Sequence, residues 1–187
     1  MSARFQVRPT PLEGLVVLER SMHRDDRGQL ERLYCSEELR PWLGGATVTQ
    51  SNLTHTGRRG TVRGMHLQTP PHAEDKLVTC LQGRVWDVAV DVREGSPTFL
   101  QWYAEILDGS ENRTMLIPKG FAHGFQTLTD DCIMLYFHTS SHAPKSELGL
   151  DALDARLAIA WPEAVLHRSP RDCTHPSIGP SFTGIRS

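Results

Sequence analysis

Several features that would identify common classes of protein are absent from this chain of 187 residues. Its four cysteines are widely spaced and include no Cys-x-x-Cys pair, which excludes a zinc knuckle and a dithiol redox motif. The formal net charge of −2 lacks the basic excess of most nucleic-acid-binding proteins, so we expect no nucleic-acid partner. The longest apolar runs, such as Leu15–Leu18, are far too short to span a bilayer, so we expect no membrane partner either.

Signals for export and for a Rossmann-type nucleotide site are also missing. Residues 1–10 contain no apolar segment of the kind found in signal peptides, and we therefore expect a cytoplasmic protein with reduced cysteines. No Gly-x-Gly-x-x-Gly follows any strand-like run, which argues against a dinucleotide-binding βαβ unit. At this length the chain can bury a sizeable core as one domain.

Short runs of β-branched, aromatic and aliphatic residues, by contrast, are abundant. From Val48 onward Gly, Pro, Asn and Asp separate these runs at intervals of roughly 8–12 residues, which is typical of an all-β sandwich or barrel. The runs predict eight strands, at Val48–Leu53, Thr61–Leu67, Leu77–Leu81, Val85–Val92, Thr98–Leu107, Thr114–Ile117, Gly124–Leu128 and Cys132–Thr139.

Little helix is predicted. Ser36–Arg40 predicts a short helix with Ser36 as its cap, and Asp151–Ile159 predicts a second one. We expect a single domain over residues 1–187. Its parts are an N-terminal arm with strands (1–47), a core barrel (48–140), and a C-terminal helix and tail (141–187).

Two predicted strands carry charged or polar residues on one face. In the run 85–91, alternation places Asp87, Ala89 and Asp91 together. The run 132–138 is predicted to have a core face of Ile133, Leu135 and Phe137 and a polar face of Met134, Tyr136 and His138. Because charged side chains are costly to bury, this pattern favours a barrel whose interior is open at one end and can hold a ligand.

The stretch Gly60–Lys76 concentrates cationic and titratable side chains just before an apolar run, Leu77–Leu81. Such groups beside a buried sheet suit a site for an anionic substrate. Within this stretch His66 is either a structural histidine or a catalytic base. Strict alternation puts Arg63 and His66 on opposite faces, so both reach one ligand only if Gly64 permits a β-bulge.

Tyr136 is the second candidate for chemistry. A tyrosine on a strand usually packs in the core, but this one shares its face with His138. A phenol can donate a proton from the side opposite an imidazole base, provided that its pKa falls towards neutrality or its proton is relayed. Asp172 could orient the histidine through its other ring nitrogen.

A metal site has to be weighed against this proton chemistry. Metal-binding cupins use a His-x-His pair with a nearby Glu, followed by a Pro-x-Gly-x-x-His segment. The second half is present at Pro118–His123, whereas His66–Gln68 offers one imidazole and one amide. A transition metal needs three or four firm ligands, so we expect no bound metal and no cofactor.

Four segments carry motifs that together indicate a family. They are Arg63–Gln68 with Pro70-Pro71 and Lys76–Val78; Asp87–Arg93 with Gly95–Phe99; Ile117–Phe125; and Ile159–Pro162. In this order they resemble the signatures of the dTDP-4-dehydrorhamnose 3,5-epimerase family, over nearly the whole chain from Arg27 to Asp172. Any one match could arise by chance, but four in register are specific.

The resemblance implies a metal-free, cupin-like jelly-roll homodimer. It also implies epimerisation of a nucleotide-diphospho-4-keto-6-deoxyhexose at C3 and C5. By motif match His66 is the base and Tyr136 the acid, Lys76 stabilises the enolate, and Asp172 pairs with the histidine. The residues expected to hold the nucleotide sugar are Arg27, Gln50, Asn52, Arg63, His123, Glu147 and Arg171. Arginines suit a diphosphate because their guanidinium binds it in a bidentate fashion.

The sequence departs from the family pattern in several places. Arg32 stands where a glutamate is common, and Arg171 stands where the tail has a lysine. Thr139–Pro144 lacks the aromatic residues expected near the base, and Ala152–Ala155 replaces Trp-Asp-Asp-Pro. Five alternatives therefore stay open: a monoepimerase, a different nucleotide such as CDP, a 3,4-ketoisomerase, a non-catalytic sugar-nucleotide binder, and a metal-dependent cupin oxygenase.

Overall fold

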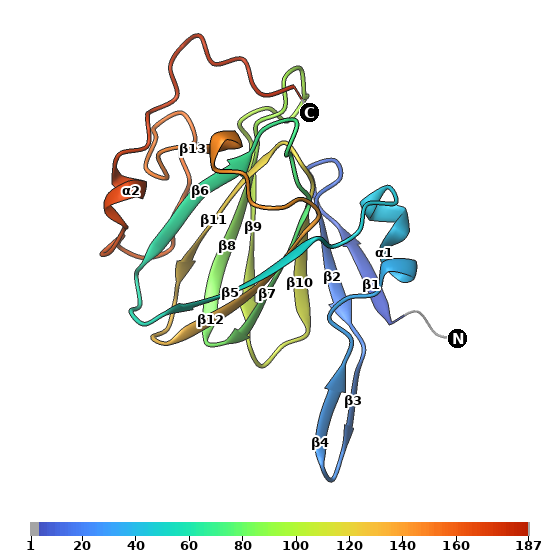
Figure 1. The fold of residues 1–187 in the computed structure, drawn as a ribbon. Coiled ribbons are helices and arrows are strands. Elements are labelled where there is room, and N and C mark those ends of the chain that lie inside the picture. The colour runs from blue at the N-terminus through green and yellow to red at the C-terminus, as the bar shows by residue number, and fades with distance from the viewer. Residues whose placement is uncertain (1–3, 187) are drawn as a thin grey trace.

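Two β-sheets packed face to face form the body of the protein, of which a computed structural model describes residues 4–186 (Figure 1). The six-stranded sheet has the order β1 (Phe5–Pro9), β2 (Val16–Arg20), β10 (Arg113–Ile117), β7 (Lys76–Gln82), β12 (Cys132–His138), β5 (Gln50–Thr56). The five-stranded sheet has the order β13 (Glu147–Gly149), β6 (Val62–Gln68), β11 (Phe121–Thr127), β8 (Arg84–Asp91), β9 (Trp102–Asp108). β3 (Met22–Asp25) and β4 (Gly28–Glu31) form a separate hairpin.

The order of strands β5 to β12 is that of a jelly roll. β5, β12, β7 and β10 lie in one sheet, β6, β11, β8 and β9 in the other, and all neighbours are antiparallel. Two interlocked Greek keys produce this arrangement. The prediction of an all-β, cupin-like jelly roll is confirmed, and each of the eight predicted strands is present. In the N-terminal segment, β1 and β2 extend the large sheet, and the β3–β4 hairpin projects away from it (Figure 1).

Details of the prediction were wrong where polar side chains bond the backbone or each other. The strand predicted from Thr98 begins at Trp102, because the hydroxyls of Ser96 and Thr98 both donate to the carboxylate of Asp91 and hold a turn. In the predicted helix Asp151–Ile159 there are only turns.

The aspartates in that segment explain the turns. Asp151 accepts a hydrogen bond from the backbone N–H of Leu153, and Asp154 accepts one from that of Arg156. Such side-chain bonds compete with helical ones.

Three helical segments are observed: α1 (Ser36–Leu43), the 3₁₀ helix η1 (Pro144–Ser146) and α2 (Pro170–Cys173). Helix α1 confirms the first predicted helix, but its cap is Cys35, and Ser36 is the first helical residue. No helix within residues 4–186 has the length and hydropathy of a transmembrane segment.

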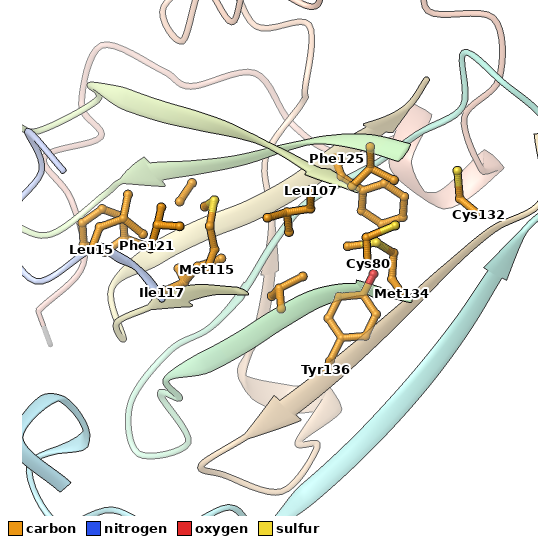
Figure 2. Close-up of a cluster of buried hydrophobic side chains, with 14 of the residues drawn as sticks. Leu15, Cys80, Leu107, Met115, Ile117, Phe121, Phe125, Cys132, Met134 and Tyr136 are labelled. Carbon is orange, nitrogen blue, oxygen red and sulfur yellow. The ribbon is translucent and has the colours of Figure 1, made fainter. Parts of the chain in front are cut away.

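A cluster of buried side chains fills the space between the two sheets (Figure 2). Met134 and Tyr136 of β12 point into it, and Tyr136 extends towards Phe125. The expectation that Ile133, Leu135 and Phe137 form the core was therefore wrong. All three are half-buried on the outer face, where Phe137 packs against the cluster under α1. The polar-looking face of β12 lines the interior instead, where it opens into a cavity.

Part of the outer face of each sheet is also covered. Helix α1 packs Leu39 and Leu43 over the large sheet. The C-terminal segment covers the small sheet, where Trp161 packs edge-on against Trp86 at 5.4 Å between ring centroids. This apolar cover holds the segment that contains α2 beside β6 (Figure 1).

A bulge in β6 settles which of its residues share a face. His66 pairs with His123 of β11, whereas Arg63 pairs with Phe125. Between these two pairs β6 advances by three residues and β11 by two, so β6 contains one extra residue. Gly64 adopts φ +117° inside the bulge, and a Cβ there would lie 2.6 Å from the Cα of Gly124. The predicted bulge at Gly64 is confirmed, and it brings Arg63 and His66 to the same cavity.

Replacing Gly64 by alanine should therefore destabilise the fold. Positive φ and the backbone clash together predict a loss of about 3 kcal/mol in the free energy of unfolding, measured by urea denaturation. Gly57→Ala is the matched control, because the nearest atom to a Cβ there, Asp131 Oδ1, is 3.8 Å away. Equal stabilities for the two variants would contradict the constraint.

Candidate active site

A cavity of about 800 Å³ opens between the two sheets. Its walls come from β5, β7 and β12 of the large sheet, from β6, β11 and β13 of the small one, and from residues 167–172. Ten of the eleven site residues predicted from sequence line it: Gln50, Asn52, Arg63, His66, Lys76, His123, Tyr136, Glu147, Arg171 and Asp172. Arg27 does not. It lies in the β3–β4 turn, where it pairs with Asp25, and its side chain is 89% exposed.

His66 and Asp172 form the shortest contact between predicted catalytic residues. Nε2 of His66 lies 2.7 Å from Oδ1 of Asp172. The carboxylate is buried, whereas the imidazole is about one-third exposed and faces the cavity. Since Nε2 donates to Asp172, Nδ1 is the ring nitrogen that can accept a proton.

Local sequence explains the position of Asp172. Ser169 caps α2 by accepting the backbone N–H of Asp172 at 3.0 Å, and Pro170 suits the first helical position. Burial alone would raise the pKa of Asp172. Hydrogen bonds from His66, from Ser169 and from the backbone of Gly64 outweigh it and hold the pKa at about 2. The carboxylate is therefore ionised beside the imidazole at neutral pH.

Lys76 lines the cavity and belongs to a network of buried charges. Its ammonium is 3.3 Å from Glu74 and donates to the backbone oxygen of His66 at 3.3 Å. The other oxygen of Glu74 is 3.0 Å from Nδ1 of His138. Burial opposes ionisation of Glu74, but these two partners lower its pKa below the usual value. The ammonium is thus held between Glu74 and the strand that carries His66.

Tyr136 lies in the opposite sheet from His66. It is buried, its hydroxyl is 3.4 Å from that of Thr54, and its ring stacks on His138 and meets His123 edge-on. Burial raises the pKa of Tyr136 well above the usual value. The first condition named for Tyr136 as an acid, a lowered pKa, is therefore not met. The second, relay of its proton, stays a prediction.

His123 has a fixed partner of its own. Its Nε2 lies 2.8 Å from Oδ1 of Asp87, a fully buried aspartate whose pKa is raised by burial and only partly lowered by the histidine. The face of β8 that carries Asp87 thus points inward, as its sequence indicated.

The predicted substrate-binding residues form the rim and walls. Arg63 is exposed and its Nε donates to Thr56 at 3.0 Å. The Gln50 amide donates to Asn52 and accepts the backbone N–H of His142. At the rim, Glu147 pairs with Arg171 at 2.8 Å, so both belong to one polar edge.

The residues of the incomplete cupin metal motif bond other groups. The amide of Gln68 bonds residues of the loop 141–143, and His123 bonds Asp87. Within residues 4–186, the ligand-type atoms that converge are those of His66, Asp172 and His175. The His66–Asp172 separation of 2.7 Å is a hydrogen bond and is shorter than the roughly 3.3 Å between two donors on a tetrahedral zinc.

Some cavity residues were missed from the sequence. They are Thr54, Glu74, His142, His167 and Arg168. The spacing offered a signal for Glu74, which precedes Lys76 by two positions. For Arg168, which bonds Asp151 and the backbone oxygen of Asp172, no pattern distinguished it from a surface arginine.

Comparison with known proteins adds a family to this geometry. The family model described as dTDP-4-dehydrorhamnose 3,5-epimerase matches residues 9–179. A dTDP-4-dehydrorhamnose 3,5-epimerase of Streptomyces griseus is 39% identical over 160 residues, which are 85% of this chain and 79% of that protein.

Two solved structures are similar over nearly their whole length. The dTDP-6-deoxy-D-glucose-3,5-epimerase of Legionella pneumophila, in complex with dTDP-4-keto-L-rhamnose, superimposes with a TM-score of 0.91 at 34% identity over 98% of each chain. A 3′-monoepimerase from Streptomyces bikiniensis, in complex with dTDP-quinovose, does so with a TM-score of 0.84 at 34% identity, over 90% of this chain and 86% of that one.

The His66–Asp172 pair should contribute to stability in a pH-dependent way. Asp172→Asn removes a charged acceptor and should cost about 2 kcal/mol at pH 7, measured by urea denaturation. Because the pKa of Asp172 is lowered on folding, its contribution is complete above pH 4 and is lost as the pH falls towards 2. The gap between wild type and variant should shrink as the pH falls from 4 towards 2. A gap that keeps widening over that range would contradict the assignment.

Proposed function

The chain belongs to the dTDP-4-dehydrorhamnose 3,5-epimerase family, and we propose that His66 and Tyr136 move protons on opposite faces of its sugar substrate. It is a carbohydrate epimerase, an isomerase that acts on a nucleotide-diphospho-4-keto-6-deoxyhexose. The observation that supports these residue roles is the placement of the His66–Asp172 pair and Tyr136 in opposite sheets around one cavity.

His66 is the base in this proposal. A 4-ketone acidifies the neighbouring C–H groups, so Nδ1 takes the proton while the C–H electron pair forms the enolate. Asp172 stabilises the imidazolium that results. The ammonium of Lys76, which lines the cavity, stabilises the charge on the enolate oxygen.

Tyr136 returns a proton from the other face and thereby inverts the carbon. Its raised pKa keeps it protonated until the carbanion forms. Among nearby charges Arg63 favours the phenolate, so it can assist the transfer while it also contacts the substrate. The reaction moves protons and changes no oxidation state, so we propose that it uses neither a metal nor a redox cofactor.

The rim of the cavity binds the nucleotide diphosphate in this proposal. Arg63 and Arg171 present exposed guanidinium groups there, which suit the phosphates. Gln50, Asn52, His123 and Glu147 provide further polar contacts. The related structure binds a dTDP-sugar, and we propose the same class of substrate. His142 pairs with Glu147 at the place where the expected aromatics are missing, so contacts to the base should differ.

We further propose a homodimer. Leu53 of β5 is 60% exposed and pairs with Leu135 of β12, which gives the outer face of the large sheet an apolar surface suited to a second copy. A dimer would also explain why Arg27 lies outside its own cavity, because a projecting hairpin can reach a partner's cavity.

We also propose a cytoplasmic location, as expected from the sequence. All four cysteines are free thiols, which agrees with a reducing compartment.

A monoepimerase is the second candidate, supported by the similarity to the 3′-monoepimerase. Nuclear magnetic resonance of the sugar after turnover in D₂O distinguishes the two, because a monoepimerase labels one carbon and a 3,5-epimerase labels C3 and C5.

Replacing the proposed base should abolish turnover while the fold survives. His66→Asn should lower kcat by about 10²- to 10⁴-fold, because general-base catalysis contributes that much. Deuterium uptake from D₂O into a dTDP-4-keto-6-deoxyglucose substrate should fall in parallel. His55→Asn is the control, since His55 is exposed, pairs with Asp131 and lies outside the cavity lining. Wild-type deuterium uptake by His66→Asn would refute the base.

Mixing two inactive variants tests the role of Arg27 in a dimer. If the arginine acts in the partner's cavity, heterodimers of Arg27→Ala and His66→Asn contain one intact site. Roughly a quarter of the wild-type activity should then return after subunits exchange. If no activity returns although mass measurement shows mixed dimers, Arg27 does not act across the interface.

A further inference from the structure

His175 lies against the proposed base although the proposed mechanism does not use it. Its ring meets that of His66 edge-on, at 5.4 Å between centroids and an interplanar angle of 82°. It follows α2 by two residues and shares the oxygen Oδ1 of Asp172 with His66, from which its Nε2 is 3.4 Å away.

A glycine on β13, the strand next to β6, leaves space for the His175 ring. Gly149 of β13 pairs with His66, and a Cβ at Gly149 would lie 2.1 Å from Cε1 of His175. Any other residue at 149 would displace the imidazole. The His175 side chain is only 11% exposed, so it occupies a fitted position between the glycine and the catalytic histidine.

The buried Nε2 of His175 lies near a carboxylate without forming a hydrogen bond. Nε2 of His175 has no aligned hydrogen-bond partner among residues 4–186, although the carboxylate oxygen is 3.4 Å away. A buried, unpaired nitrogen is costly and needs a reason. A second donor near Oδ1 competes with His66 for the same negative charge.

We propose that His175 is a positioning residue that keeps His66 in its neutral, proton-accepting form by competing for Asp172. The inference rests on the proposed role of His66 as base. Two imidazoles beside one carboxylate cannot both be protonated without repulsion, so each ring resists the protonation of the other. The Nε2–H of a neutral His175 also weakens the pull of Asp172 on a proton at His66.

The charges around the two rings agree with this direction. Asp172 and Arg171 of α2 act on His175, and Lys76 of β7 holds its ammonium 3.3 Å from the backbone oxygen of His66. Arg168, before α2, donates to the backbone oxygen of Asp172. The side chain of Arg168 pairs with Asp151, and that of Arg171 pairs with Glu147. The carboxylate of Asp172 therefore has the two histidines as its charged or titratable neighbours. Burial first, then the neighbouring His66, lower the pKa of His175, which favours its neutral form.

His175→Phe tests this inference, because phenylalanine keeps an aromatic ring and removes both nitrogens. The acid limb of the kcat/KM profile, which reports the free base, should move to higher pH by about 0.5 to 1 unit. The plateau value of kcat/KM should stay within about threefold of wild type. A purely structural role would lower the plateau without moving the limb. His55→Phe, at the exposed histidine outside the cavity lining, should leave the profile unchanged.

A measurement without substrate separates this inference from the proposed function. With isotope-labelled histidine, nuclear magnetic resonance follows the protonation of His66 directly in wild type and in His175→Phe. The variant should protonate at higher pH than wild type. Coincident titration curves would overturn the inference even if the enzyme is an epimerase. A shifted curve would support it even if His66→Asn proved active.

Discussion

The hydrogen bond between His66 and Asp172 is the interaction on which the architecture of this site depends. It joins residues that are 106 positions apart, and several features have to be in place before it can form. The bulge at Gly64 puts His66 on the cavity side. The apolar cover around Trp161 holds the C-terminal segment against the small sheet, and the cap of α2 aims the carboxylate. The C-terminal segment therefore positions the carboxylate of Asp172 beside His66.

Buried charge is the second constraint, and the fold meets it by pairing histidines with carboxylates. His123 bonds Asp87, His138 bonds Glu74, and His66 bonds Asp172, all beside the same cavity. Carboxylates in a β-sandwich interior would be costly to ionise if they stood alone. Each carboxylate fixes the orientation of the imidazole that it bonds. The same pairing gives the site its expected sensitivity to pH.

The sequence predicted the strands well because their residues alternate or are continuously apolar between turn formers. It also predicted the bulge, since Arg63 and His66 could meet only through Gly64. It failed at Asp151–Ile159, where aspartate side chains bond the backbone, and on β12, where Tyr136 points into the interior although its face looks polar. His175 and Arg168 could not be identified from the sequence. Their importance comes from contacts with Asp172 that no local spacing encodes.

The central claim is that one base and one acid act on opposite faces of the sugar. The most direct measurement is turnover of the Tyr136→Phe variant in D₂O with a 4-keto-6-deoxy nucleotide sugar. The sugar is then analysed for both deuterium and configuration. The account predicts deuterium uptake with the original configuration retained, because His66 still removes a proton and returns one to the same face. Inversion at the wild-type rate, or complete loss of exchange in a folded variant, would contradict it.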